Sequence, residues 1–329
     1  MTQVLGAFLL PLLAVIGGTR LALAWLTGKA ILDHPNERSS HSRPTPRGGG
    51  LAVTPVVLMT WAAIWAGGSP VAGLGPVLAG GAVLFALSWM DDKGGLSARL
   101  RLALHVLAVG AGLLAFPADH LVCQGWLPLW ADRLVAMIAW VWFVNLFNFM
   151  DGIDGITGVE TGSLGLGLAL LAALSGDGPG QWLALSAAAA GIGFLVWNWH
   201  PAKIFLGDSG SIPLGYLLGW LLLRTAADGN WAPALVLPAY YLADATLTLA
   251  RRAWRGEKIF QAHRQHFYQQ AIQGGFRHST VASMIALANL GLIALALTAL
   301  THPWAALAVA AADVTLLLVL LAALGRRRR

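Results

Sequence analysis

The chain has 329 residues, of which 57% are hydrophobic and 11% are Asp, Glu, Lys or Arg. A soluble domain carries roughly 25% charged residues, so this composition excludes a soluble protein, and the high apolar content excludes a disordered one. The net charge of +6 fits basic loops on the inner side of a membrane better than a nucleic-acid surface. We therefore predict an all-α, polytopic integral membrane protein that contacts the lipid bilayer and no nucleic acid, with residues 1–329 forming a single domain.

Eleven stretches approach the roughly 20 apolar residues that a membrane-spanning helix needs. Unbroken runs such as Ala286–Leu300 do not show the roughly 10-residue alternation of barrel strands. The first stretch is expected to be a retained span, because Met1-Thr2-Gln3 lacks the basic residues of a signal peptide. In chain order the predicted spans are residues 4–26, 50–67, 71–90, 99–117, 133–149, 156–175, 181–199, 209–224, 231–250, 280–300 and 302–324.

The basic residues are distributed unevenly among the loops between these spans. With the N-terminus outside, the inner segments hold most of the Lys and Arg residues; they are residues 27–49, 91–98, 150–155, 200–208 and 251–279, and the tail from Gly325. The positive-inside rule predicts that these loops and the C-terminus are cytoplasmic.

The loop from Asp33 to Gly50 combines two arginines with a run of glycines. Arg43 and Arg47 offer planar guanidinium donors to a phosphate, and Gly48-Gly49-Gly50 would let backbone N–H groups approach an anion. A phosphate-contacting loop and an ordinary basic inner loop are both open at this point.

Acidic residues and one amide gather at the inner ends of the spans. Asp91 and Asp92 are adjacent, and such carboxylates repel each other at a membrane edge unless a cation or proton relieves them. Asn148 and Asp151 are three apart, so a continuing helix would bring their oxygens to one ion. The set is Asp91, Asp92, Asn148, Asp151, Asp154 and Asp208. The alternatives are a solvated helix end, a plain turn and, for Asp208, a helix N-cap.

Basic side chains and histidines accompany these acids. Arg101 follows the double Asp, and Lys203 stands near Asp208 as a phosphate partner. The loop 251–279 carries His263, Arg264 and His266, which suit a diphosphate. The alternative is an amphipathic helix on anionic headgroups. Two histidines with no matching third ligand do not make a zinc site.

Together these segments predict phosphoryl transfer onto a lipid carrier at the cytoplasmic edge of the bundle. Mg²⁺ is usually held by one or two carboxylates plus substrate phosphates, and the basic residues suit those phosphates. A nucleotide-linked substrate could arrive from water and a lipid phosphate from the bilayer. The sequence contains no Walker loop and no dinucleotide fingerprint, so ATP or NAD chemistry is unsupported.

Four of these motifs, in this order, resemble those of the polyprenyl-phosphate N-acetylhexosamine-1-phosphate transferases, glycosyltransferase family 4 in its bacterial sense. The opening run from Ser39-Ser40-His41-Ser42 to the three glycines is similar to the branch that starts O-antigen and related surface glycans. The resemblance covers about Asp33 to Tyr268 and implies ten or eleven helices in a bacterial inner membrane. The four motifs are Met90-Asp91-Asp92, Asn148-Phe149-Met150-Asp151-Gly152-Ile153-Asp154-Gly155, Phe205-Leu206-Gly207-Asp208-Ser209-Gly210-Ser211 and His263-Arg264-Gln265-His266.

The resemblance implies transfer of a sugar 1-phosphate from a UDP-N-acetylhexosamine to undecaprenyl phosphate, with release of UMP and with Mg²⁺, or Mn²⁺ in its place, as cofactor. Asp208 would be the principal metal ligand, with Asn148 and Asp151 as its neighbours. Asp91 resembles the residue proposed to deprotonate the lipid phosphate, and Asp92 would support it. We favour direct attack, because a lipid phosphate is already an anionic nucleophile at neutral pH, over an acyl-phosphate intermediate on an Asp.

The same resemblance sorts the other candidates. His263, Arg264 and His266 would handle the diphosphate or the sugar. The catalytic candidates are Asp91, Asp92, Asp151 and His263, and the substrate-binding candidates are Arg43, Arg47, Arg101, Asp154, Lys203, Arg264 and His266.

Two departures from the family pattern bear on the substrate. The peptidoglycan branch has three consecutive histidines, whereas Arg264 and Gln265 separate two here, which argues against a muramoyl-pentapeptide substrate. A family lysine after the double Asp has no clear match, and Arg101 lies near its expected place. The donor sugar stays open among N-acetylglucosamine, N-acetylfucosamine and N-acetylquinovosamine, and a homodimer is also left open.

Two other functions compete with the transferase. A secondary transporter also uses intramembrane acids and broken helices, but it predicts acids near span midpoints, where only Asp244 and Asp313 come close. A membrane diphosphatase would differ by accepting water in place of the lipid.

Overall fold

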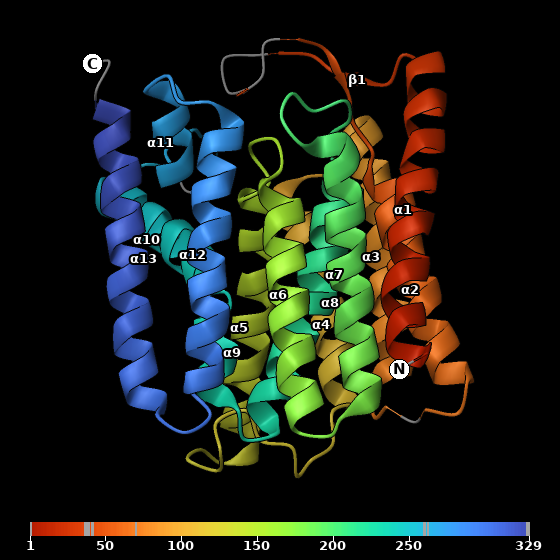
Figure 1. Ribbon diagram of the computed structural model, residues 1–329, viewed down its shortest axis with the longest axis vertical. Coiled ribbons are helices and arrows are strands. Elements are labelled where there is room, and N and C mark those ends of the chain that lie inside the picture. Colours follow the sequence, from red (N-terminus) through yellow and green to blue (C-terminus); the bar gives the residue numbers. More distant parts are fainter. Residues whose placement is uncertain are drawn as a thin grey trace.

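The computed structural model describes residues 2–35, 40, 43–69, 71–258, 261 and 263–326. It is 75% helical, which confirms the all-α class. Most of the helices run side by side (Figure 1). They are α1 (Thr2–Gly28), α2 (Gly50–Ala66), α3 (Leu74–Gly94), α4 (Ala98–Leu114), α5 (Leu129–Phe149), α6 (Ile156–Leu174), α7 (Gly178–Asn198), α8 (Asp208–Ala227), α9 (Trp231–Val236), α10 (Ala239–Trp254), α11 (Phe267–Gln273), α12 (His278–Thr298) and α13 (Pro303–Arg326). The short strands β1 (Leu32–Asp33) and β2 (Thr45–Pro46) pair antiparallel.

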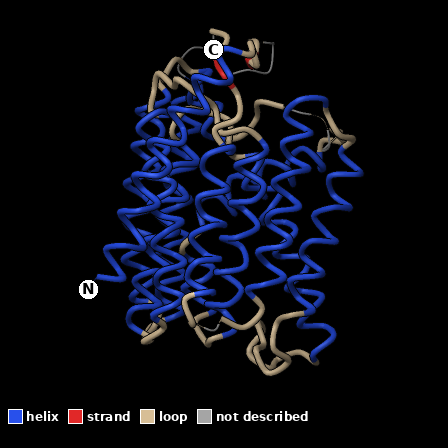
Figure 2. Tube along the Cα trace, turned by 90° about the vertical axis from the view of Figure 1, so that its right-hand side faces the viewer, coloured by secondary structure: helices blue, strands red, loops and turns tan. Residues whose placement is uncertain are grey.

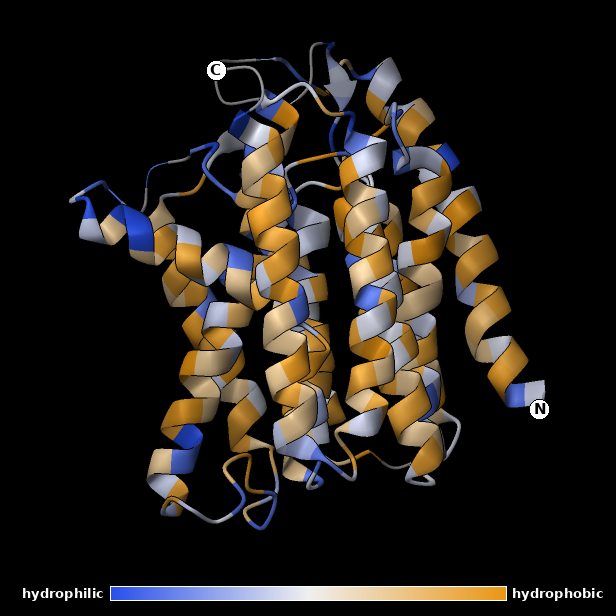
Figure 3. Ribbon diagram, turned by 60° about the vertical axis from the view of Figure 1, so that its left-hand side comes forward, coloured by the Kyte–Doolittle hydropathy of each residue, from blue (hydrophilic) through white to orange (hydrophobic). Residues whose placement is uncertain are grey.

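The outer surface of the bundle is apolar, as a lipid environment requires. Seven of the described helices are long and apolar enough to cross a membrane, namely α1, α3, α5, α6, α7, α12 and α13. Large side chains such as Leu10, Leu107, Leu114 and Leu287 are exposed, and hydrophobic residues dominate the sides of the bundle (Figure 3). Such a surface is costly in water and favourable in hydrocarbon. The protein is therefore a multi-pass membrane protein.

Helix α8 lies at the centre of this bundle. It packs against α2, α3, α5, α6, α7 and α9, and nearly all its side chains are buried. Trp140 of α5 stacks on Tyr216 of α8 with ring centroids 4.8 Å apart, and its indole N–H donates to the Tyr216 carbonyl. Because α8 is held from all sides, its first residue, Asp208, has a fixed place.

One predicted span differs from the structure. Residues 231–250 do not form one helix: α9 ends at Val236, and α10 starts at Ala239 after Pro238. Proline removes a backbone donor and clashes with the preceding turn, so the chain changes direction there. Helix α10 then runs obliquely to the bundle (Figure 1) and carries Arg251 and Arg252 in its last turn.

The segments that the sequence placed on one side of the membrane lie at one end of the bundle. The β1–β2 hairpin, α11 and the C-terminal end of α13 share this end (Figures 1 and 2). The connections around residues 95–97, 150–155 and 199–207 lie between helix ends that face the same way. We call this the polar end.

Candidate active site

The start of α8 is tied to the end of α3 through Asp92. The Asp92 carboxylate accepts hydrogen bonds from the backbone N–H groups of Asp208 (2.9 Å) and Ser209 (3.0 Å). These are unpaired donors of the first helical turn, where a negative charge is also favoured by the helix dipole. Gly207, with a φ of +77°, makes the approach possible, since a Cβ there would lie 2.8 Å from the Asp92 carboxylate. Asp92 therefore caps α8 from a different helix.

Two arginines converge on Asp208. Arg47 Nη2 lies 2.7 Å from Asp208 Oδ1, and Arg47 Nε lies 3.1 Å from Asp92 Oδ1. Arg101 Nη1 lies 3.3 Å from Asp208 Oδ2 and 2.9 Å from Asp91 Oδ2. Three carboxylates and two guanidinium groups thus form one cluster, which we call the Asp–Arg cluster.

The other contacts of this cluster complete its hydrogen bonding. Asn148, at the end of α5, donates through its amide nitrogen to Asp208 Oδ1 (3.1 Å) and to the Ser211 hydroxyl (2.9 Å). The backbone N–H of Leu96 donates to Asp91 Oδ1. A buried carboxylate is tolerated only when it is paired and hydrogen-bonded in this way.

The glycine run before α2 serves packing. The N–H groups of Gly48 and Gly49 donate to the Phe205 carbonyl, and that of Gly50 donates to the Leu206 carbonyl. A Cβ on Gly50 would lie 2.2 Å from the Gly210 nitrogen. The expectation that these N–H groups approach an anion is therefore wrong, because backbone carbonyls already accept from them.

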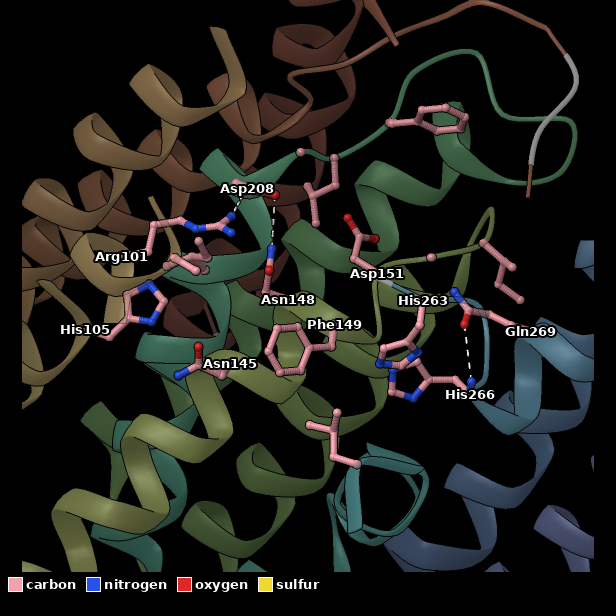
Figure 4. Close-up of a pocket in the computed structure, with 18 of the residues that line it drawn as sticks. Arg101, His105, Asn145, Asn148, Phe149, Asp151, Asp208, His263, His266 and Gln269 are labelled. Carbon is pink, nitrogen blue, oxygen red and sulfur yellow. Dashed lines mark hydrogen bonds and ion pairs between the residues drawn. The ribbon is translucent and has the colours of Figure 1, made fainter. Parts of the chain in front are cut away.

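Asp151 follows the end of α5, and its hydrogen bond is separate from the Asp–Arg cluster. Its Oδ1 accepts a hydrogen bond from the Thr157 hydroxyl at 2.6 Å. Burial raises the pKa of the Asp151 carboxyl to about 6, and the hydrogen bond from Thr157 only partly opposes this rise. Figure 4 shows Asp151 on the far side of Asp208 from Arg101.

The two histidines of the 251–279 loop are held by Asp244. His266 Nδ1 lies 3.1 Å from Asp244 Oδ1, and the same carboxylate accepts from the N–H groups of Phe267 and Tyr268 at the start of α11. His263 stacks on His266 with centroids 4.9 Å apart. Burial and the charges of His266 and Arg252 lower the pKa of His263 to about 4. At pH 7 the His263 imidazole is therefore neutral, so it offers hydrogen bonds and no charge to the space around it.

A third group surrounds Asp154. Its Oδ2 lies 2.6 Å from His200 Nδ1, and its Oδ1 lies 3.2 Å from His278 Nδ1. His278 Nε2 lies 3.0 Å from the Ser40 carbonyl. Burial alone would raise the pKa of Asp154, but these histidines and the Ala202 N–H hold it below its usual value. The group ties the loops at residues 40, 154 and 200 to the start of α12.

These groups line one cavity of about 910 Å³ at the polar end. Arg101, Asn148 and Asp208 lie on one side, and His263, His266 and Gln269 lie on the other (Figure 4). Its wall is otherwise apolar where it meets α4 and α5, through Leu102, Val106, Met137, Ile138 and Val141. The cavity can therefore accept a polar, multiply charged ligand beside an apolar chain.

The sequence is similar to those of several known proteins. Residues 74–226 match the family described as Glycosyl transferase family 4. The chain is 27% identical to the probable undecaprenyl-phosphate N-acetylglucosaminyl 1-phosphate transferase of Bacillus subtilis, over 84% of this chain and 80% of the relative. It is 29% identical to the decaprenyl-phosphate N-acetylglucosaminephosphotransferase of Mycolicibacterium smegmatis, over 81% and 76%. It is 33% identical to a phospho-N-acetylmuramoyl-pentapeptide-transferase of Synechococcus sp., over 70% and 69%.

The chain belongs to the polyprenyl-phosphate N-acetylhexosamine-1-phosphate transferases. The family resemblance is thereby confirmed, and the protein is a sugar-1-phosphate transferase. The matched residues 74–226 contain the acids and the Asn of the first three motifs. Arg47 and the histidine loop lie outside that range and join the site only through the fold.

Most of the catalytic, substrate-binding and metal-binding residues predicted from the sequence lie around this cavity. Those that line it are Arg47, Arg101, Asn148, Asp151, Asp154, Asp208, His263 and His266. Asp91 and Asp92 reach the same place through the Asp–Arg cluster. Their chemical roles stay predictions, and the contacts of Asp92 are those of a positioning residue.

Three predicted substrate-binding residues do not line the transferase cavity. Arg43 and Arg264 are exposed. Lys203 is exposed, and its ammonium group lies 5.2 Å from the centroid of the Trp197 ring. Of the surface-glycan motif, Ser39, His41 and Ser42 lie outside the described residues.

Sequence reasoning did not assign three residues that shape the transferase cavity. Asp244 orients His266, His278 holds Asp154, and Asn198 accepts from the Gly155 N–H through Oδ1 at 2.8 Å. Asp244 was visible as a buried acid, but its partner lies 22 residues away. His278 and Asn198 stand alone in their segments, so no local pattern marks them.

The donor atoms of the Asp–Arg cluster fit the expected Mg²⁺. Asp91, Asp92 and Asp208 offer only oxygen ligands, which is the chemistry that Mg²⁺ prefers. Arg47 and Arg101 offset two of the three negative charges that the ionised carboxylates would carry, so the cluster can accept further positive charge. Asp208 and Asn148 are joined by a hydrogen bond, whereas Asp151 is bonded to Thr157.

Proposed function

We propose that this transferase moves an N-acetylhexosamine 1-phosphate from a UDP-sugar to undecaprenyl phosphate and releases UMP. The observation that carries the proposal is one cavity in which the Asp–Arg cluster adjoins an apolar wall of α4 and α5. A nucleotide diphosphate suits the charged part, and a lipid phosphate suits the boundary between the two.

In the proposed reaction an oxygen of the lipid phosphate attacks the sugar-bearing phosphorus of the UDP-sugar. A new P–O–P bond forms, the bond from that phosphorus to the bridging oxygen breaks, and the bridging oxygen leaves with UMP. Arg47 and Arg101 offset the negative charge that two phosphate groups bring together. Asp91 accepts the proton when the lipid phosphate arrives singly protonated. We favour this direct attack, because positioning and charge neutralisation suffice for an anionic nucleophile.

We propose Asp208, with Asn148 and Asp151, as the residues that would hold Mg²⁺, with Mn²⁺ as an alternative. When bound, the ion would neutralise charge on the diphosphate oxygens. Asp92 contributes by fixing the start of α8, since its carboxylate accepts from the N–H groups of Asp208 and Ser209.

We place the reaction at the cytoplasmic face of a bacterial inner membrane, as the first step of a lipid-linked surface glycan of the O-antigen type. The concentration of Lys and Arg in the loops of the polar end supports this orientation. The separation of His263 and His266 by Arg264 and Gln265 argues against a muramoyl-pentapeptide donor. The names of the Bacillus and Mycolicibacterium relatives favour testing N-acetylglucosamine first.

The test uses purified protein with undecaprenyl phosphate and a panel of UDP-sugars, followed for UMP and for a lipid-linked product. We expect release that needs the lipid and stops with EDTA. Asp208→Asn should lower the rate by about 10³-fold, the size seen when one electrostatic group of a transition state is removed. The matched control is Asp228→Asn, at the opposite end of α8, which should keep the wild-type rate.

Three results would contradict the proposal. Release of UMP without lipid would indicate a diphosphatase. Full activity in EDTA would show that the reaction needs no metal ion. Full activity in Asp208→Asn would show that the Asp208 carboxylate is not needed for transfer. The amide has nearly the same size as the carboxylate, so this variant tests the charge and not the packing around α8.

A further inference from the structure

His105 is a polar residue in α4 for which the reaction above has no role. Its side chain is 5% exposed and lines the cavity. Its Nδ1 is buried and has no hydrogen-bond partner among the described residues. Leaving such a group unpaired is unfavourable, so the protein leaves hydrogen-bonding capacity of this cavity-lining imidazole unused.

The position of His105 indicates which ligand that is. It lies four residues after Arg101, so both side chains project from one face of α4. Figure 4 shows His105 between Arg101 and Asn145, on the side of Asp208 away from His263 and His266. The next cavity residue along α4 is Val106, and Val141 of α5 lies one turn before Asn145. His105 therefore stands where the charged part of the cavity meets its apolar wall.

We propose that His105 contacts the phosphate of the lipid acceptor and selects the phosphorylated lipid over other amphiphiles. The proposal rests on the proposed function. A lipid whose first apolar units lie against Val106 and Val141 must leave its head group beside His105 and Arg101. Arg101 supplies charge, and His105 supplies one further hydrogen bond. A phosphate monoester, with its second ionisation near pH 6, can donate or accept there, and so can an imidazole.

Asn145 lies beside this imidazole (Figure 4). Its amide nitrogen donates to the Val141 carbonyl at 2.7 Å, which fixes the orientation of the amide. His105 lies on the side of Asp208 away from His263 and His266 (Figure 4), so we expect it to affect the lipid substrate and not the UDP-sugar.

The test compares His105→Leu, which removes the hydrogen bond, with His105→Gln, which keeps a polar group. We expect the KM for undecaprenyl phosphate to rise about tenfold in the Leu variant, the worth of one hydrogen bond, and to recover most of the wild-type value in the Gln variant. The KM for the UDP-sugar should stay unchanged in both. The control is His302→Leu, an exposed histidine between α12 and α13, which should behave as wild type. If His105→Leu does not fold, His105→Met takes its place.

A binding experiment separates phosphate contact from contact with the lipid chain. Undecaprenyl phosphate and undecaprenol compete for the protein, and their affinity ratio is measured. We expect the ratio to fall about tenfold in His105→Leu and to be restored in His105→Gln. Equal weakening of both lipids, or no change in either, would overturn the inference. A wild type that releases no UMP with any UDP-sugar would instead overturn the proposed function.

Discussion

Arg47 and Asp208 are 161 residues apart in sequence, and their side chains lie 2.7 Å apart. The same guanidinium group also contacts Asp92 through Nε at 3.1 Å. One arginine therefore joins the N-terminal hairpin, the end of α3 and the start of α8. Because Asp92 in turn caps α8, Arg47 controls both the position and the charge of the proposed metal ligand.

Arg47→Lys should lower the transfer rate by about 100-fold, although the charge is kept. A lysine ammonium is a point charge and cannot reproduce the fork that contacts two carboxylates at once. The rate of UMP release is measured at saturating substrates. Arg20→Lys, at an exposed position of α1, is the matched control, and equal rates for the two variants would show that the fork is unimportant.

Gly50→Ala should destabilise the protein by about 1–3 kcal/mol, the usual range for overpacking. The added Cβ would lie 2.2 Å from the Gly210 nitrogen and 2.4 Å from the Ser209 carbonyl carbon, and neither backbone atom can move without displacing Asp208. Thermal unfolding in detergent measures the loss. Gly17→Ala in α1 meets no atom within 4 Å and should be neutral or stabilising. A Gly50→Ala protein as stable as Gly17→Ala would mean that α2 and α8 are less tightly packed than described.

Asp244→Asn should lower both the stability of the protein and its activity. The amide keeps the shape of the carboxylate, but its NH2 group cannot accept, so the shared contacts of His266, Phe267 and Tyr268 lose at least one acceptor. We expect a loss of about 1–3 kcal/mol in the folded state and, with His266 misplaced, at least a tenfold lower rate. Asp313→Asn in α13 is the control acid. An active Asp244→Asn protein would show that the orientation of His266 does not matter for transfer.

The raised pKa of Asp151 predicts a pH dependence of stability. Its folded value is about 6, above the ordinary carboxyl value of about 3.9. The folded state thus binds the proton more tightly, and its stability should rise as the pH falls from about 7 toward 4. The melting temperature, measured in EDTA so that no metal competes with the proton, should show this rise in the wild type. Asp151→Asn should remove that part of the dependence, and an unchanged profile would contradict the burial of an ionisable Asp151.

The helices could be predicted from the sequence because helix formation in a membrane depends on local composition. A run of about 20 apolar residues must satisfy its own backbone in a membrane and therefore forms a helix, and ten predicted spans match single helices in the structure. The span at 231–250 was wrong because Pro238 interrupts a stretch that is apolar on average. The reading of Gly48–Gly50 also failed, since the atoms that their N–H groups contact belong to Phe205 and Leu206.

The sequence by itself determined the membrane class, the grouping of the polar loops at one end of the bundle and the residue types of the candidate site, because composition, apolar length and charge bias act without knowledge of neighbours. Only the tertiary structure decided which of those residues meet. Hydrogen bonds and ion pairs depend on a few tenths of an ångström between segments that are distant in the chain, as for Arg47 with Asp208, Asp244 with His266 and His278 with Asp154. Helix packing sets those separations, and no local pattern in the sequence records them.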